Sequence, residues 1–403
     1  MEAPVFRPGR SQGAGVAMTD DYDALVIGAG PAGLATSREL ARRGVSHLVV
    51  ERGGTVGQTW ADLYDSLVLH TTRRLSALPD LAFPPGTPRF PTRLDLLGYL
   101  REYARRFSLP VQVDTPVVGL QRTSRHWTVR TSRGDTLAAR AVVVASGIVS
   151  NPYEPPLPGR ERFAGCVVHS AAYRRTAPFA GQRVLVVGAG NSAADIAVDL
   201  ARDGIDVTLA VRSGALVLPL RVAGIPIQYL GFALAALPRR AQHAFGTAMR
   251  AASTLVGRRP ILPPPPIRDC ARVPVIGHHL AEALQCGRVR MKRGAVDLVP
   301  GAVRCADGDV LPIDTVILAT GYRAAVGFLS GVARLDGCGF AMRTDAVTSA
   351  DHPGLYFVGH NPDIRGGLYR IGRDARLAAA RIRSSLDGTQ RTPTERRPPP
   401  YER

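Results

Sequence analysis

The sequence is poor in cysteine and has no dithiol pair. Its five cysteines are scattered over 403 residues, and no two of them are separated by just two positions. An odd number of scattered thiols argues against a disulfide scaffold and for a reducing compartment, so we expect a cytoplasmic protein. Redox chemistry that depends on a C-x-x-C pair is excluded.

Lysine is almost absent. Lys292 is the single lysine, and arginine supplies nearly all of the positive charge behind a formal net charge of +18. GC-rich codons produce an arginine bias of this kind, so it says little about partners. No nucleic-acid-binding motif accompanies the charge, and we expect no nucleic-acid partner. Anionic ligands account for part of the basicity.

Long hydrophobic runs are also missing. The uncharged stretch 222–237 is interrupted by Pro226, and a membrane-spanning helix needs about 20 apolar residues. We expect this stretch to lie in an apolar insertion, 215–256, that packs over a substrate pocket; a membrane-surface segment is the alternative. Residues 1–20 have no apolar core of a signal peptide. They are expected to form a disordered leader, and residues 387–403 a disordered tail.

Two glycine-rich loops, far apart in the chain, carry the most information. Each follows an apolar stretch expected to be a strand and precedes an expected helix. The loops are Gly28-Ala29-Gly30-Pro31-Ala32-Gly33 and Gly188-Ala189-Gly190-Asn191-Ser192-Ala193. In such a loop the first glycine permits a tight turn, the second lets backbone N–H groups approach a pyrophosphate, and a small third residue lets helix and strand pack closely. The sequence therefore predicts an α/β protein with two Rossmann-like dinucleotide-binding domains.

The residues that end the following strands distinguish the two loops. The expected strand 47–50 ends in Glu51, followed by Arg52, and a carboxylate there hydrogen-bonds an unphosphorylated ribose and repels a 2′-phosphate. The expected strand 207–211 ends in Arg212, whose guanidinium suits a 2′-phosphate. We therefore predict FAD (or NAD) at the first loop and NADPH at the second.

Further strands end in small residues, as expected where backbone lies against a cofactor. The additional candidates for cofactor contact are Thr59, Trp60, Gly147, Ala319, Thr320, Gly321, Tyr322 and Gly359. Apolar residues between 92 and 108 recur at helical spacing, and 374–386 is expected to be the last helix. We expect a discontinuous FAD domain, 21–175 and 311–386, into which an NADPH domain, 176–310, is inserted.

Residues 163–174 resemble a signature of the flavin-containing monooxygenases. The pattern F-x-G-x-x-x-H-x-x-x-[YF]-[KR] is matched at each fixed position, including His169. Residues 319–322 match the A-T-G-Y motif of the family, and 57–60 resemble its G-G-x-W segment with Gln58 in place of the second glycine. His169 is expected to be a structural histidine at a domain junction rather than a proton donor.

The segment 64–70, Tyr-Asp-Ser-Leu-Val-Leu-His, is similar to the YUCCA-type branch of that family. The resemblance implies an NADPH- and O₂-dependent FAD monooxygenase that oxygenates a small organic substrate through a C4a-(hydro)peroxyflavin. The reaction would be oxidative decarboxylation of a 2-oxo acid such as indole-3-pyruvate, or N- or S-oxygenation. Resemblance places Asn191 near the nicotinamide, although it equally suits a helix start. His70 either contacts the flavin or only packs.

Two other classes remain open at this point. An NADPH-dependent FAD reductase or dehydrogenase that passes electrons to a separate acceptor shares the tandem loops, and so does a flavin-binding sensor without activity. No metal cluster or nucleophilic triad is apparent in the sequence. The expected partners are a small-molecule substrate and O₂, and the oligomeric state is left open, with a homodimer as one option.

Overall fold

The computed structural model describes residues 19–388 except 124–125, 213–216, 223, 236–237, 239–274, 362 and 364. The expected leader, except its last two residues, and almost all of the expected tail lie outside these residues. So does most of the expected insertion 215–256. Within the described ranges, no helix combines the length and the apolar character needed to cross a membrane.

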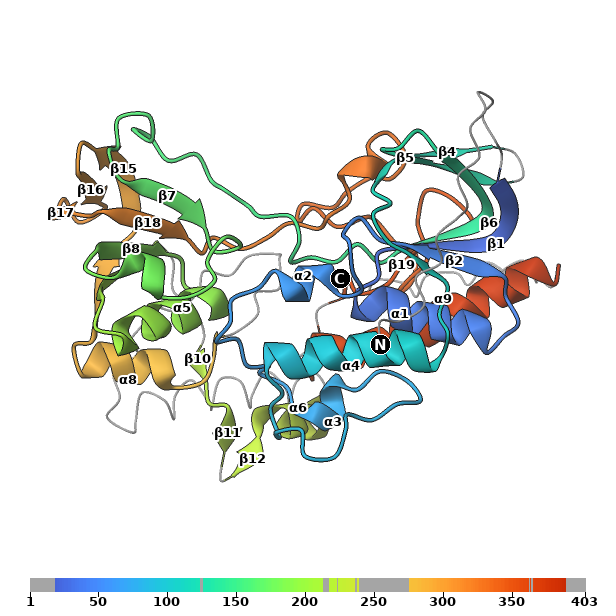
Figure 1. Cartoon of the computed structure of the whole chain (residues 1–403), viewed down its shortest axis with the longest axis horizontal. Coiled ribbons are helices and arrows are strands. Elements are labelled where there is room, and N and C mark those ends of the chain that lie inside the picture. Colours follow the sequence, from blue (N-terminus) through green and yellow to red (C-terminus); the bar gives the residue numbers. More distant parts are fainter. Residues whose placement is uncertain are drawn as a thin grey trace, which may run out of the picture.

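The first sheet is built mainly from the N-terminal third of the chain (Figure 1). Its strand order is β3-β2-β1-β6-β5-β4, and β19 joins it beside β6. The central strands β1, β2, β6 and β19 run parallel, whereas β4 and β5 form an antiparallel extension. The strands are β1 (Thr19–Ile27), β2 (His47–Val50), β3 (Val111–Gln112), β4 (Val117–Arg122), β5 (Trp127–Thr131), β6 (Thr136–Val144) and β19 (Leu355–Phe357).

The second sheet is parallel throughout, with the order β14-β9-β8-β18-β7. Its strands are β7 (Cys166–His169), β8 (Arg183–Val187), β9 (Asp206–Val211), β14 (Val289–Arg293) and β18 (Thr315–Leu318). Because the chain returns from this sheet to β19 of the first, the second unit is inserted in the first. Both β7 and β18 fall outside the range 176–310 that the sequence suggested for the inserted unit. The assignment of each unit to one nucleotide stays a prediction.

Helices cover both sheets, and α1, α4, α5 and α9 lie where the sequence pattern predicted helices, whereas α8 was not predicted. The core on one face of the first sheet includes α1, α4 and α9, and residues 324–341 pack on its other face. Helices α5 and α8 pack on the second sheet. The helices are α1 (Pro31–Ala41), α2 (Gln58–Ala61), α3 (Arg73–Ser76), α4 (Arg93–Arg106), α5 (Asn191–Arg202), α6 (Ile227–Ala235), α8 (His279–Gln285) and α9 (Gly367–Leu386), with 3₁₀ turns at Ala177–Phe179 and Gly327–Leu329. Thr92 and Asp95 form a reciprocal capping box that sets the start of α4.

Smaller elements complete the second unit. An antiparallel sheet of β15 (Ala295–Val299), β16 (Ala302–Cys305) and β17 (Val310–Pro312) packs beside the second sheet. The segment between β9 and α8 holds β10 (Val217–Leu218), β11 (Arg221–Val222), β12 (Ile225–Pro226) and β13 (Val275–Ile276). Figure 1 shows α6 and the β11–β12 hairpin near α3, away from the second sheet, and the hydroxyl of Tyr229 in α6 lies 3.4 Å from that of Thr72, which precedes α3.

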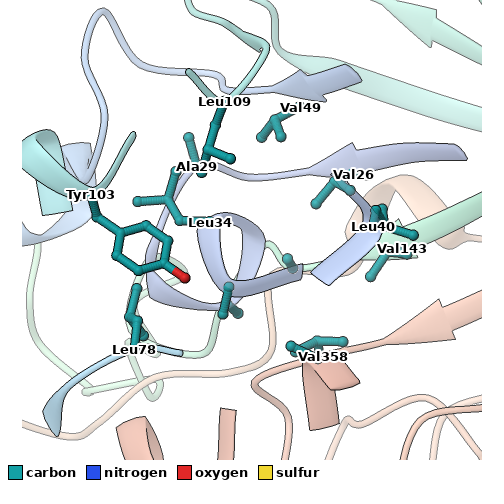
Figure 2. Packing of buried hydrophobic residues seen from close by; sticks show 14 of the residues in the cluster. Val26, Ala29, Leu34, Leu40, Val49, Leu78, Tyr103, Leu109, Val143 and Val358 are labelled. Carbon is teal, nitrogen blue, oxygen red and sulfur yellow. The ribbon is translucent and has the colours of Figure 1, made fainter. Parts of the chain in front are cut away.

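The core around α1 holds the first glycine-rich loop in position. Leu34 and Leu40 of α1 are fully buried, and so is Tyr103 of α4 (Figure 2). The hydroxyl of Tyr103 donates a hydrogen bond to the carbonyl of Pro79 at 2.7 Å. Burying side chains of this size contributes about 1.5–3 kcal/mol each, so the start of α1 is anchored by apolar packing rather than by a side-chain cap.

The expectation that the cysteines are free thiols holds for only some of them. Among the described cysteines, Cys166, Cys286 and Cys305 are free. Cys338 is disulfide-bonded, which the scattered spacing did not predict. Sequence spacing reports no distances in space, so it does not show which thiols meet.

Candidate cofactor site

The first glycine-rich loop, residues 28–33, forms a concave backbone surface that we call the first cradle. Larger side chains at its glycines would clash with backbone or occupy the open space. Gly28 has φ +107°, and a Cβ there would lie 2.6 Å from the carbonyl oxygen of Ala145. A Cβ at Gly33 would lie 1.7 Å from the Gly28 oxygen, whereas one at Gly30 would meet no atom within 4 Å. Open space therefore lies before the first turn of α1, which has Pro31 at its start and no side-chain cap. Such a helix start fits a pyrophosphate.

The second loop repeats this geometry at the start of α5. Gly188 has φ +144°, and a Cβ there would lie 2.2 Å from the carbonyl oxygen of Ala319. Gly190 again has no atom within 4 Å of the added Cβ and caps α5 without a side-chain hydrogen bond. Ala193 takes the third position of the loop and is fully buried. Ser192, beside it in the first turn, is half-buried.

Glu51 stands at the edge of the first cradle. Its side chain is buried, and its two oxygens accept hydrogen bonds from the backbone N–H of Ala29 at 2.7 Å and of Gly53 at 2.9 Å. A carboxylate has about four acceptor positions, so these two bonds leave capacity for ribose hydroxyls. Arg52, beside it, is exposed and donates to the carbonyl of Ser150 at 3.3 Å.

Arg212 occupies the matching place on the second sheet. It follows β9 directly and is exposed. The loop and this strand are joined by a hydrogen bond from the Gly188 N–H to the Ala210 carbonyl at 3.0 Å. The guanidinium of Arg212 therefore lies two residues beyond Ala210, the strand residue that is hydrogen-bonded to the second glycine-rich loop. It is exposed to solvent and accessible to a charged ligand.

Several of the other candidates gather around the first loop. The N–H of Gly57, which caps the helix α2 that holds Thr59 and Trp60, donates to the Ala29 carbonyl at 3.0 Å. A Cβ at Gly359 would lie 2.9 Å from Cβ of Ala32. Gly147 follows Ala145, the residue against which Gly28 packs.

The candidates at 319–322 belong to the second sheet instead. Ala319 packs against Gly188, and the Thr320 hydroxyl donates to the Tyr153 carbonyl at 2.5 Å. Gly321 accepts from the Tyr153 N–H at 3.0 Å, so this turn ties the second sheet to the linker after β6. The ring of Tyr322 packs edge-on to the ring of His169, with centroids 5.1 Å apart.

His169 contacts the backbone through both of its ring nitrogens. Its Nδ1 accepts from the Ala171 N–H at 3.1 Å, so the proton resides on Nε2, which donates to the Gly321 carbonyl at 3.1 Å. Burial lowers its pKa. A neutral imidazole with both nitrogens engaged by backbone holds the turn in place and has no free position for proton transfer.

A group of titratable side chains joins the two units at α5. Asp195 accepts a hydrogen bond from the Tyr64 hydroxyl at 2.7 Å and contacts Nε2 of His279 at 2.9 Å and Nε2 of His70 at 3.7 Å. Burial and the charge of Asp195 raise the pKa of Tyr64 well above its usual range. Burial lowers the pKa of His70 against the opposing effect of Asp195.

Sequence reasoning found His70 but missed Asp195, Tyr64 and His279. The available signal was the position of Asp195, four residues after Asn191 and thus on the same face of α5. Asn191 itself begins α5, and its Oδ1 accepts from the Ile276 N–H at 2.8 Å. The two predicted catalytic residues therefore lie near the same end of α5, one on it and one beside Asp195.

Helix α6 packs over the segment that contains His70. Gln228 donates through Nε2 to the carbonyl of His70 at 2.6 Å, and the hydroxyls of Tyr229 and Thr72 are 3.4 Å apart. The ring of Phe232 lies edge-on to that of Tyr369 in α9, with centroids 5.0 Å apart. The described part of the apolar insertion thus contacts the first unit, and that it covers a substrate pocket stays a prediction.

Comparison with known proteins gives relatives that are all oxidoreductases. Residues 25–217 match the model of the pyridine nucleotide-disulphide oxidoreductase family. The chain is 34% identical over 315 residues to the indole-3-pyruvate monooxygenase YUCCA1 of Oryza sativa subsp. japonica, covering 75% of this chain and 77% of that protein. It is 31% identical over 350 residues to a CzcO-like oxidoreductase of Geobacillus kaustophilus, covering 87% and 94%.

A solved structure extends the likeness over nearly the whole chain. The flavin-containing monooxygenase from Stenotrophomonas maltophilia superposes with a TM-score of 0.73 at 25% identity, covering 91% of this chain and 100% of that one. The likeness therefore extends over most of both units.

Proposed function

Since this chain belongs to the flavin-dependent monooxygenase family that includes the YUCCA enzymes, we propose that its Gly28 loop binds FAD and its Gly188 loop binds NADPH. The protein is an FAD-dependent NADPH monooxygenase. The assignment of the loops is supported by the residues beside them. Buried Glu51 retains acceptor capacity for a ribose, and exposed Arg212 offers a guanidinium to a 2′-phosphate.

In this proposal the cofactors provide the redox chemistry, and the protein binds and orients them. When bound and reduced by NADPH, FAD would activate O₂, from which one oxygen atom is transferred to the substrate and the other is released as water. The chain orients both nucleotides through the starts of α1 and α5. Helix α6, which is uncharged, would help to shield the segment around His70 from water.

His70 and Asn191 are the proposed side chains at the reaction centre. His70 is held by Gln228 through its backbone and faces Asp195 with its ring, so its position is defined on both sides. Asn191 is held by the N–H of Ile276. A fixed amide at the start of α5 is suited to orient the nicotinamide, and the imidazole to hydrogen-bond the flavin or the substrate.

We further propose a small organic substrate with an aromatic part, in the class of the 2-oxo acids. Tyr229, Phe232 and Tyr369 contribute rings beside the His70 segment, and the relatives of this chain include a protein named indole-3-pyruvate monooxygenase. Oxidative decarboxylation would release CO₂. N- or S-oxygenation of a soft nucleophile is the alternative within the same family.

The deciding experiment is an NADPH-oxidation screen over amines, sulfides, ketones and 2-oxo acids. Coupled turnover with CO₂ release from an aromatic 2-oxo acid is the expected result. A product heavier by one oxygen, without CO₂, assigns N- or S-oxygenation if it forms from an amine or a sulfide, and Baeyer–Villiger oxygenation if it forms from a ketone. In stopped-flow, the reduced enzyme with NADP⁺ and O₂ should pass through a transient absorbance distinct from reduced and oxidised flavin. Direct return to oxidised flavin, with fast turnover of an electron acceptor, would make the protein a reductase.

A further inference from the structure

Asp195 is a carboxylate that pairs with histidines rather than with arginine. Its side chain is 17% exposed, and its ion-pair partners in the described part of the chain are Nε2 of His279 at 2.9 Å and Nε2 of His70 at 3.7 Å. An imidazole is charged only when it is protonated, so these partners give Asp195 no permanent counter-charge. The other described carboxylates that are ion-paired and no more exposed than Asp195 each have an arginine partner; they are Glu39, Asp351, Asp363 and Asp374.

The two oxygens of Asp195 are divided among three neighbours. Oδ1 faces His279, whereas Oδ2 accepts from the Tyr64 hydroxyl at 2.7 Å and is the oxygen nearer to His70. A distance of 3.7 Å is too long for a hydrogen bond, yet a carboxylate charge still acts on a ring at that distance. The charge favours an N–H over a lone pair on the side of the ring that faces it. It therefore favours the neutral form of His70 that has its proton on Nε2.

The other ring nitrogen of His70 is then a hydrogen-bond acceptor. Nδ1 has no printed partner among the residues that the structure describes, and the side chain is 26% exposed, so a ligand can reach it. The backbone of the residue is fixed independently, because Gln228 donates to its carbonyl at 2.6 Å. Burial lowers the pKa of His70, against the opposing effect of Asp195, so the ring is mainly neutral at pH 7.

The charged and titratable groups that face His70 come from both units. Asp195 lies on α5 and His279 begins α8; the charge of Asp195 raises the pKa of His70, and that of a protonated His279 lowers it. Tyr64 keeps its proton, because burial and Asp195 raise its pKa well above the usual range. Helix α6, which packs on the same segment, has no charged residue. One carboxylate and one neighbouring imidazole therefore set the protonation of His70.

We propose that Asp195 is a positioning residue for the reaction: it selects the His70 tautomer with the proton on Nε2, so that Nδ1 is offered as an acceptor at the reaction centre. Asp195 belongs to the helix that begins at the Gly188 loop, whereas His70 belongs to the first unit. The imidazole is thus prepared for its role only where the two units meet. The inference rests on the proposed place of His70 at the reaction centre.

The test compares Asp195→Asn with Asp199→Asn in the full-length, FAD-loaded protein. Both changes remove a carboxylate charge from the same face of α5, but Asp199 has hydroxyl partners, on Ser66 and Tyr173, and no histidine ion pair among the described residues. Nitrogen-15 NMR of labelled histidine shows which ring nitrogen carries the proton, and His70→Gln assigns the signals of His70. We expect the proton on Nε2 in the unchanged protein and in Asp199→Asn, and a mixture of tautomers in Asp195→Asn.

The same spectra, recorded over a range of pH, give the pKa of His70. It should fall in Asp195→Asn, which removes the attracting charge, and rise in His279→Gln, which removes a like charge. In NADPH oxidation with a substrate from the screen, Asp195→Asn should lower kcat about tenfold or more and leave the KM for NADPH unchanged, because a reacting group is misoriented. Asp199→Asn should keep kcat and the pKa of His70.

The spectra and the kinetics can each overturn the proposal. A proton that stays on Nε2 in Asp195→Asn would show that the carboxylate does not select the tautomer. An unchanged kcat in Asp195→Asn, or an equal loss in Asp199→Asn, would show that Asp195 has only a structural role. If no substrate of the screen is turned over, the proposed function fails, and the tautomer and pKa of His70 still decide whether Asp195 acts on this ring.

Discussion

Asp195 accepts a hydrogen bond at 2.7 Å from the hydroxyl of Tyr64, and this bond joins α5 of the inserted unit to the segment after α2 of the first unit. One turn further along α5, Asp199 accepts from the hydroxyls of Ser66 at 2.8 Å and Tyr173 at 2.7 Å. Two carboxylates on one helix face therefore attach the helix of the Gly188 loop to the segment that contains His70.

Asp195→Ala should destabilise the folded protein. Tyr64 is only 4% exposed, and the change removes the acceptor of its hydroxyl hydrogen bond. The change also removes the hydrogen-bond partner of His279. An unsatisfied buried hydroxyl costs about 1–3 kcal/mol of unfolding free energy. The control is Asp206→Ala, which breaks an exposed pair with Arg290 and should cost less than about 1 kcal/mol. Urea denaturation of both variants measures the difference; equal losses would show that Asp195 contributes no more than a surface charge.

Gly30→Ala and Gly190→Ala should separate the two nucleotide sites. An added Cβ at either position meets no protein atom within 4 Å, so both variants are expected to fold. The methyl group occupies the space through which a pyrophosphate approaches the helix start. Gly30→Ala should therefore weaken FAD binding alone, and Gly190→Ala should weaken NADPH binding alone. Isothermal titration with each nucleotide checks this, and a variant that weakens the other nucleotide would contradict the assignment of the loops.

The sequence was sufficient to predict the two strand–loop–helix units, because their patterns are local. The loops at Gly28 and Gly188 predict strand, turn and helix from steric needs within a few residues, and the structure has these elements. Pairings between distant segments leave no such pattern. That β18 joins the second sheet between β7 and β8 follows from packing of the whole chain. Likewise, the meeting of Tyr64 with Asp195 and the burial of His360, whose ring nitrogens have no hydrogen-bond partner among the described residues, depend on three-dimensional neighbours.

Arg212→Ala should reduce the preference for NADPH over NADH. Loss of a charged hydrogen bond to a 2′-phosphate is expected to raise the KM for NADPH about tenfold or more, while the KM for NADH, which has no such group, stays constant. Arg290→Ala, on the neighbouring strand β14, is the matched control and should leave both constants unchanged. Steady-state kinetics with the two nucleotides decides the matter, and an unaltered NADPH preference in Arg212→Ala would place the 2′-phosphate elsewhere.

Protonation of His360 should make the FAD-free protein less stable in mild acid. The folded imidazole has a pKa of about 4, whereas in the unfolded chain its pKa is near the ordinary 6.5. Between these values the unfolded state binds a proton that the folded state does not, so the unfolding free energy decreases as pH falls below 6.5. From pH 7 to pH 5 this histidine contributes a loss of about 2 kcal/mol. Because other buried histidines add their own losses, the measurement is the difference between His360→Leu and the unchanged protein in denaturation at both pH values. The variant should lose less stability by that amount, and parallel losses would mean that His360 is protonated in the folded state near its ordinary pKa.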